Sequence, residues 1–507
     1  MTPRRPTLLA LGVVAALTMA ACSSGKSALD SGSDADSTDA PAGTDAPEST
    51  TDDGTPATTL PATTTTIPLS DLPACPTDAL DAEDGTVDIV FWHAMANDLD
   101  PELIALTDAY NASQDRVHVE LQNQIGYDSV IDKYIAASSS SRPTLVQLPE
   151  YALQEFADSG TFVPTSSCIE ASGYDTDPIL PRALGAYQLE GVQWGMPFNV
   201  SNPVLFYNRK MFVEAGLDPD VPPVSLEQLQ AAAQAIVDSG AASAGLVLDS
   251  GADSGGGWFL EQWFGRSGEL YADNGNGRLA RATEVLYDNE LGAELLTFLQ
   301  GMIDDGLAVN VGDNASGTDS LLKLADQTAP AAMVMYTSAA LGTVFNALGG
   351  GAIPGLTAED VGVGPMPGPG ETPAVQVGGA SLWIAGDKSD AETAAAWDFI
   401  TYLTSAETQS TWAAGTGYVP IRADATMIEP LVTKYADDPR YKVAYDQLVS
   451  GQNDVVNNSP ALGPLREVRA ETANAVATVF NGGDAAEALA AAAEASNALI
   501  RSYNERN

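Results

Sequence analysis

The feature that most constrains this chain is a regular alternation of apolar, strand-like runs with amphipathic, helix-like runs, which begins near Val87. Residues 87–92 form a short apolar run. Residues 100–102 (Asp-Pro-Glu) then supply a capping acid, a proline suited to the first helical turn and a second acid that favours the helix dipole. Residues 117–122 alternate apolar and polar side chains, which is typical of a half-exposed strand. This alternation predicts an α/β fold with a parallel sheet covered by helices on both faces.

The same pattern continues through the C-terminal half. We expect a helix that opens at Ser225, a helix over 291–303, buried strands over 331–335 and 380–384, and an Ala-rich final helix over 485–499. No tandem repeat is visible, which disfavours a structural or adhesive surface protein. Residues 273–277 faintly resemble a calcium loop, but they lack acidic ligands at the required spacing, so we expect a plain turn.

The first residues resemble a secretory signal. Two arginines precede an apolar run, over 8–21, that is too short for a comfortable membrane-spanning helix. Residues 19–22 (Met-Ala-Ala-Cys) resemble a bacterial lipobox, in which the cysteine is acylated and becomes the mature N-terminus. We expect a signal peptide over 1–21 and lipidation at Cys22, which would anchor the protein on the extracytoplasmic face of the cell membrane. A plain secreted protein with an incidental cysteine is the alternative.

Composition changes between Cys22 and the first strand. Residues 23–70 consist mainly of Ser, Thr, Asp, Pro, Ala and Gly. Such a segment buries too little apolar surface to offset the entropy of ordering it. We therefore expect residues 22–82 to form a disordered acidic tether for the globular part.

Charge and histidine count exclude several classes of function. The chain has 22 Lys and Arg against 68 Asp and Glu, a formal net charge of −46, so a nucleic acid would be repelled and no nucleic-acid partner is expected. The two histidines, His93 and His118, give little basis for a metal site or a His-based triad, and no cofactor is expected. The chain also lacks a Gly-x-Ser-x-Gly nucleophile elbow, so the sequence does not favour an enzyme.

Three cysteines are present. With Cys22 assigned to lipid, Cys75 and Cys168 remain, and an oxidising compartment outside the cytoplasm favours a disulfide between them. Two free buried thiols remain the alternative, because the sequence does not show that these residues approach closely enough to bond.

Short motifs follow one another over roughly residues 86–505. They are Phe-Trp-His-Ala-Met at 91–95, Gln-Leu-Pro-Glu at 147–150, Pro-Phe-Asn-Val-Ser-Asn-Pro-Val-Leu-Phe-Tyr-Asn at 197–208, Ala-Gly-Leu-Asp-Pro at 215–219, Val-Gly-Gly-Ala-Ser-Leu-Trp at 377–383 and Thr-Gly-Tyr-Val-Pro at 416–420. In this order they resemble the family 1 extracellular solute-binding proteins of ABC importers. Within that family they most resemble the branch that binds glycerol-3-phosphate and glycerophosphodiesters. The strings at 197–208 and 378–383 look most specific to that branch.

The resemblance implies a two-lobed, periplasmic-binding-protein-like α/β fold with hinge crossovers and a ligand cleft between the lobes. It implies that lobe one comprises 83–200 and 338–400, and that lobe two comprises 201–337 and 401–507. Lobes that rotate about a few hinge residues can enclose a ligand and signal its presence by closing. The implied partners are a small-molecule ligand and the transmembrane subunits of an ABC permease.

The resemblance also implies a ligand site. An arginine offers a planar cationic fork to phosphate oxygens, and serine hydroxyls and a glycine amide donate to anionic or hydroxyl oxygens. A glutamate accepts from glycerol hydroxyls or attracts a cationic head group, and aromatic faces pack glycerol carbons or a choline ammonium. The matching positions are Tyr127, Glu150, Ser201, Trp258, Ser338, Gly379, Tyr418 and Arg469.

Two of these positions have neighbouring rivals, Trp263 for Trp258 and Thr337 for Ser338. The implied ligand is a glycerophosphodiester such as glycerophosphocholine, or sn-glycerol-3-phosphate. An oligosaccharide is the alternative, although sugar clefts usually carry more aromatic platforms and this chain is only 7% aromatic.

Overall fold

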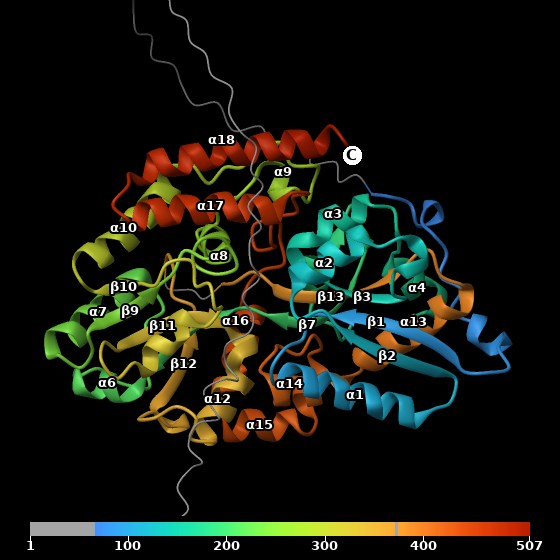
Figure 1. Cartoon of the computed structure of the whole chain (residues 1–507), viewed down its shortest axis with the longest axis horizontal. Coiled ribbons are helices and arrows are strands. Elements are labelled where there is room, and N and C mark those ends of the chain that lie inside the picture. The colour runs from blue at the N-terminus through green and yellow to red at the C-terminus, as the bar shows by residue number, and fades with distance from the viewer. Residues whose placement is uncertain (1–65, 371–373) are drawn as a thin grey trace, which may run out of the picture.

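Two separate β-sheets organise the chain (Figure 1). The computed structural model describes residues 66–370 and 374–507. The expected signal peptide, Cys22 and most of the expected tether lie outside the described residues. Among the residues described, no helix combines the length and apolar character needed to cross a membrane.

The first sheet has the strand order β2-β1-β3-β13-β4, and β7 also pairs with β13. β1 is parallel to β2 and β3, whereas β13 runs antiparallel to its neighbours. Every residue of β3 is buried, as expected of a central strand with covered faces. The strands are β1 (Val87–His93), β2 (Val117–Asn123), β3 (Leu145–Pro149), β4 (Phe162–Val163), β7 (Met196–Ser201) and β13 (Gly378–Ala385), beside a small hairpin of β5 (Gln188–Leu189) and β6 (Val192–Gln193).

Helices cover this sheet and complete the first lobe. The helix expected to begin near residues 100–102 is α1. Its proline, Pro101, lies in the first turn, where backbone N–H groups have no partner within the helix, so the N–H that proline lacks costs no hydrogen bond. α13 begins with a capping box between Ser389 and Glu392. The helices are α1 (Leu99–Ser113), α2 (Tyr127–Ala136), α3 (Leu153–Asp158), α4 (Thr165–Ser172), α5 (Pro181–Ala186), α13 (Asp390–Leu403) and α14 (Ala406–Thr416).

The second sheet has the order β10-β9-β11-β8-β12. β9 is parallel to β10 and β11, and β8 is antiparallel to β11 and β12. The strands are β8 (Pro203–Asn208), β9 (Ala244–Leu248), β10 (Ala308–Asn310), β11 (Ala331–Thr337) and β12 (Val361–Pro365).

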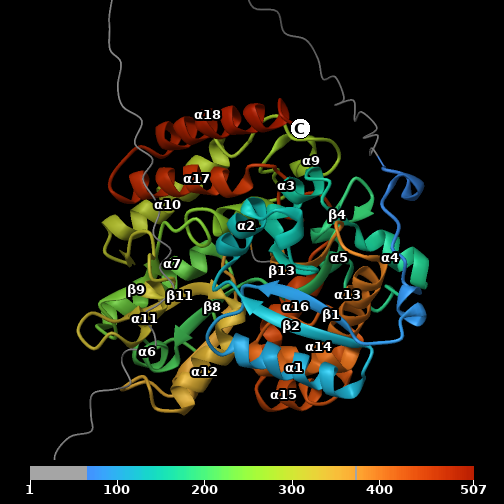
Figure 2. The same cartoon turned by 45° about the vertical axis from the view of Figure 1, so that its right-hand side comes forward.

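The second lobe is rich in helices, and two long ones, α17 and α18, lie side by side along the top of Figures 1 and 2. The expected turn at 273–277 is a single irregular turn, α9, in which Asn274 and Gly275 have positive φ. The helices are α6 (Arg209–Glu214), α7 (Leu226–Ser239), α8 (Trp258–Arg266), α9 (Asp273–Asn276), α10 (Glu290–Asp304), α11 (Asp319–Leu322), α12 (Leu341–Gly349), α15 (Leu431–Asp437), α16 (Val443–Ser450), α17 (Leu465–Phe480) and α18 (Ala485–Asn504).

The lobe boundaries differ from those expected. β12 lies within 338–400, the range expected in lobe one, but it pairs with β8 in the second sheet. It fills the edge of β8, whose backbone N–H and C=O groups would otherwise lack partners. The chain therefore returns to the first sheet between β12 and β13. α14, expected in lobe two, contacts α1 and α13 of the first lobe and also α12 and α15.

The first crossover, between β7 and β8, is held by a dense set of hydrogen bonds at Asn202. Its backbone N–H donates to the Ser338 hydroxyl at 3.3 Å, and its carbonyl accepts from the Ser338 N–H at 2.9 Å. Its side-chain amide donates to the Ala444 carbonyl at 2.9 Å and accepts from Gln447. These contacts tie the strand-to-strand link to β11 and α16.

Cys75 and Cys168 form a disulfide in the structure, with their Cα atoms 4.9 Å apart. The bond joins the segment before β1 to α4 across 93 residues of sequence. The disulfide favoured by the sequence is therefore present. It fastens to the first lobe a segment that was expected to belong to the disordered tether, and Cys75 and Leu80 of that segment are buried.

Candidate ligand site between the lobes

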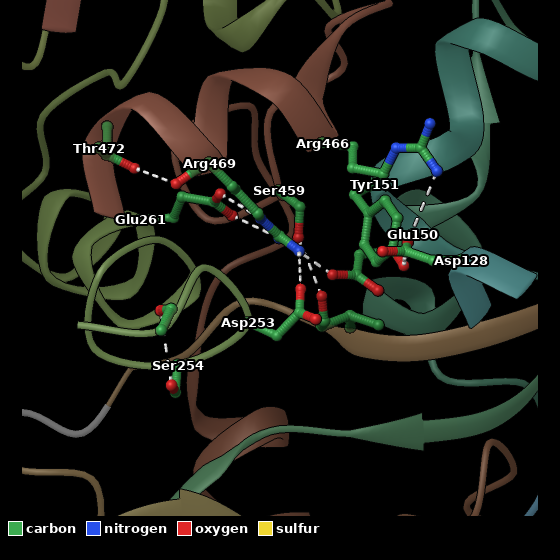
Figure 3. Close-up of polar contacts among 12 residues, drawn as sticks. Asp128, Glu150, Tyr151, Asp253, Ser254, Glu261, Ser459, Arg466, Arg469 and Thr472 are labelled. Atoms are coloured by element: carbon green, nitrogen blue, oxygen red, sulfur yellow. Dashed lines mark hydrogen bonds and ion pairs between the residues drawn. The ribbon is translucent and has the colours of Figure 1, made fainter. Parts of the chain in front are cut away.

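A buried arginine stands where the two lobes meet. Arg469 of α17 donates through Nε and Nη2 to the two carboxylate oxygens of Glu261 in α8, at 2.7 and 2.8 Å. Its Nη2 also donates to Glu150 at 3.0 Å, and Glu150 follows β3 in the first lobe (Figure 3). The Arg469 fork thus holds carboxylates from both lobes in a geometry that suits charge-assisted hydrogen bonds.

This cluster carries more negative than positive charge. Glu261 and Glu150 are buried, and Asp253 adds an exposed carboxylate 3.9 Å from Nη1 of Arg469. Burial raises the pKa of Glu150 to about 7, against the opposing effect of Arg469. Burial also raises the pKa of Glu261. One guanidinium therefore faces three carboxylates, and the sequence analysis anticipated only Glu150 among them.

A glycine-rich loop brings α8 against Arg469. The Asp249 carboxylate accepts from the N–H groups of Gly251 and Gly255, at 3.1 and 3.2 Å, which closes the loop. A Cβ at Gly257 would lie 2.1 Å from the Ala252 carbonyl oxygen and 3.0 Å from Cγ of Arg469. The loop therefore requires glycine at this position, next to the first residue of α8.

That first residue is Trp258, and its indole packs against the opposite lobe. A Cβ at Gly378 in β13 would lie 2.3 Å from Cζ2 of Trp258. The Nε1 of Trp258 is buried and has no hydrogen-bond partner among the described residues. Its rival Trp263 donates to the Pro367 carbonyl at 2.9 Å, which is a structural role. The structure thus places Trp258 at the meeting of the lobes.

A chain of hydrogen bonds connects four of the sequence motifs. The Ala94 N–H donates to the Gln147 amide oxygen at 2.8 Å, and Gln147 donates to Asn199 at 2.7 Å. Asn199 donates to the Tyr127 hydroxyl at 2.8 Å, and Tyr127 is hydrogen-bonded to Tyr418. Burial raises the pKa of Tyr127 well above its ordinary value, so the phenol stays neutral. Tyr127 and Tyr418 are therefore brought together, as expected.

Tyr187 joins this group without being expected. It is fully buried, and its hydroxyl has no hydrogen-bond partner among the described residues. Burial raises its pKa well above the ordinary value, and nearby Glu150 and Tyr418 add to the effect. The residue lies outside the motifs, so no sequence signal marked it. Its free hydroxyl offers a further donor beside Glu150.

The remaining expected residues lie at the crossover strands. Ser201 is the last residue of β7 and is paired with Gly378. Gly379 has φ 92°, and a Cβ there would lie 2.0 Å from the Asn199 carbonyl oxygen, so only glycine fits. The Ser338 hydroxyl accepts from Asn202, and its neighbour Thr337 caps the Ala339 N–H at 3.2 Å. Ser338 is therefore part of the crossover rather than of the Arg469 cluster.

Within residues 66–370 and 374–507, no group of three or more His, Cys, Asp or Glu residues is arranged to hold a metal ion. The chemistry that the site offers is hydrogen bonding, charge and aromatic packing.

Two α/β lobes joined by strand crossovers, with polar and aromatic side chains gathered between them, define a two-lobed binding protein of the periplasmic type. Residues 105–442 match the family of bacterial extracellular solute-binding proteins. The chain belongs to this family, and the expected family and fold class are confirmed.

Relatives with assigned names are similar over most of their length. The sn-glycerol-3-phosphate-binding periplasmic protein UgpB of Pectobacterium atrosepticum is 27% identical over 430 residues, covering 82% of this chain and 92% of the relative. UgpB of Escherichia coli O6:K15:H31 is 25% identical over 429 residues, covering 82% and 93%.

Solved structures share the fold. UgpB from Mycobacterium tuberculosis, in complex with glycerophosphocholine, matches with a TM-score of 0.68 at 20% identity, covering 83% of this chain and all of that one. The sugar-binding protein MalE from Xanthomonas citri matches with a TM-score of 0.67 at 18% identity, covering 82% and 98%.

Proposed function

We propose that this protein is the substrate-binding component of an ABC importer and that it captures glycerophosphodiesters, with glycerophosphocholine as the preferred ligand. The observation that carries the proposal is the buried Arg469 between the lobes, which faces Glu150, Glu261 and Asp253. The relatives UgpB support it, because their names assign them a glycerol phosphate ligand.

The charge of the cluster favours a zwitterion over a dianion. Nε and Nη2 of Arg469 are already engaged by carboxylates, which leaves Nη1 as the main donor for a ligand oxygen. A phosphomonoester would bring up to two negative charges next to three carboxylates, and like charges repel strongly at a buried site. A phosphodiester brings one negative charge, and a choline group adds a positive charge that carboxylates and aromatic faces attract.

The same residues couple binding to lobe closure. Arg469 and Glu150 come from different lobes, and Arg466, one turn earlier on α17, also reaches Asp132 of α2 at 2.9 Å. A ligand that contacts both sides stabilises the closed arrangement by its differential affinity for that state. The closed form is then the form that the permease subunits receive.

A sugar ligand has less support. Sugar-binding proteins match the fold about as well as UgpB does, so the fold does not distinguish the two ligand classes. The sequence relatives reported above favour glycerol phosphates, and the crowded carboxylates favour a ligand that carries a cation. Maltose is therefore the competing ligand in the binding experiments.

Native mass spectrometry of the purified protein tests the proposal. We expect a one-to-one complex with glycerophosphocholine that survives an excess of maltose. The ligand should be recovered chemically unchanged after long incubation, since the proposal assigns no turnover. A complex with maltose that glycerophosphocholine does not displace would contradict the proposal.

We also propose that Cys22 carries a lipid that holds the protein on the extracytoplasmic face of the cell membrane. The proposal is supported by the lipobox-like sequence before Cys22 and by membership of an extracellular family. Replacement Cys22→Ala is expected to release the protein into the medium. A variant that stays with the membrane fraction would show that the lipid assignment is wrong.

A further inference from the structure

A second, apolar compartment adjoins the tyrosine pair. It is a cavity of about 310 Å³ between the start of α1 in the first lobe and the elements from α11 to β12 in the second. Its walls are mainly aliphatic, and Tyr418 forms part of them. Representative lining residues are Ala96, Leu99, Leu321, Leu324, Val344 and Leu348.

The polar side chains that border this cavity are largely engaged within the protein. The Tyr336 hydroxyl donates to the Gly317 carbonyl, and the Thr337 hydroxyl accepts from the Ala339 N–H. Thr318 is hydrogen-bonded to Ser316 at 3.2 Å. A sugar would need free donors and acceptors here, because a polar group buried without a partner costs binding energy. The lining suits hydrocarbon instead.

Tyr418 lies at the border between the cavity and the polar site. This residue is hydrogen-bonded to Tyr127, the end of the chain of contacts that starts at Ala94, and it also lines the cavity. For a ligand whose polar part lies beside Tyr127, this space is therefore the apolar volume next to Tyr418 in which an attached apolar group could be buried. A cavity of about 150 Å³ is large enough to hold benzene, so this one accommodates a chain of several carbons.

We propose that the apolar cavity receives the acyl chain of a monoacyl glycerophosphodiester, so that the protein binds lysophospholipids with short or medium chains in addition to the deacylated diester. This inference rests on the proposed function, since the polar head occupies the same Arg469–Tyr127 site. The acyl ester is not cleaved, and the ligand is bound intact.

A chain-length series tests the inference. Affinities of the full chain would be measured by calorimetry for glycerophosphocholine and for its hexanoyl and octanoyl monoesters, all kept below their micelle concentrations. Each buried methylene is expected to tighten binding about fourfold. We therefore expect the hexanoyl ester to bind at least about tenfold more tightly than glycerophosphocholine, and the octanoyl ester more tightly again.

A cavity-filling variant locates the effect. Ala347→Trp on α12 places an indole in the cavity and should abolish the gain with chain length, while the affinity for glycerophosphocholine changes less than about twofold. Ala231→Trp, on the exposed face of α7, is the matched control and should keep the gain. The wild-type series needs no variant, so poor folding of Ala347→Trp would not prevent a decision.

The outcomes separate this inference from the function on which it rests. Binding of glycerophosphocholine with equal or weaker binding of its acyl esters would overturn the inference alone. A gain with chain length that persists unchanged in a folded Ala347→Trp protein would also overturn it, because the chain would then lie elsewhere. Binding of none of these compounds would overturn both proposals.

Discussion

The two ends of the interlobe site differ in the kind of interaction they offer. At the Arg469 end, a guanidinium and carboxylates from both lobes are buried together. At the Tyr418 end, neutral phenols open onto an aliphatic cavity. Buried charges are costly unless they are paired in good geometry, so the first end should control lobe closure and ligand charge. Apolar contacts are not directional, so the second end should add affinity without changing which head group is bound.

The largest effect expected from this difference is on stability. Arg469→Ala leaves Glu261 and Glu150 buried without their cation, which should lower the free energy of unfolding by about 3–5 kcal/mol. Arg466→Ala, one turn away on the same helix, removes partly exposed ion pairs and should cost less than about 1 kcal/mol. Urea denaturation of both variants measures the difference. Equal losses of stability would show that the buried Arg469 cluster stabilises the protein no more than the partly exposed ion pairs of Arg466.

A smaller effect is expected where Trp258 meets β13. Gly378→Ala places a Cβ 2.3 Å from the indole, so the ring or the strand must shift, at a cost of about 1–3 kcal/mol. Gly301→Ala in α10 is the control, because a Cβ there has open space and should stabilise the helix by about 0.5–1 kcal/mol. Thermal unfolding should move the two variants in opposite directions. An unchanged thermal stability of Gly378→Ala would mean that Trp258 does not pack tightly against the first lobe.

The pH dependence of binding gives the third test of the charged end. The pKa of Glu150 is raised to about 7, so at pH 6 the free protein holds it mostly protonated and at pH 8 mostly ionised. A ligand ammonium prefers the ionised form, so the affinity for glycerophosphocholine should rise by about tenfold from pH 6 to pH 8. Glu150→Gln should flatten this profile, whereas Glu467→Gln, on the exposed side of α17, should leave it unchanged. A wild-type affinity independent of pH would contradict the role given to Glu150.

Sequence reasoning predicted the fold class because the alternation of strands and helices is a local pattern. It did not predict the position of the second crossover, because whether β12 joins β8 or the first sheet depends on which sheet edge is unfilled in space.

The site was predicted in part. Glu150, Arg469, Tyr127 and Tyr418 were named as ligand positions from the family resemblance, and the structure brings Glu150 to Arg469 and Tyr127 to Tyr418. Glu261 was missed, because one carboxylate among 68 acidic residues carries no signal until the fold places it beside Arg469. The role of Arg469 also changes, since a residue expected to be free for phosphate is already bound to two carboxylates.

Calorimetry with glycerophosphocholine, sn-glycerol-3-phosphate and maltose, under identical conditions and on the full chain, tests the central claim most directly. The charge of the Arg469 cluster predicts binding with one site per protein for glycerophosphocholine, and weaker binding for sn-glycerol-3-phosphate. Heat of binding from maltose alone, with neither glycerol compound giving a signal, would contradict the claim and establish a sugar-binding protein instead.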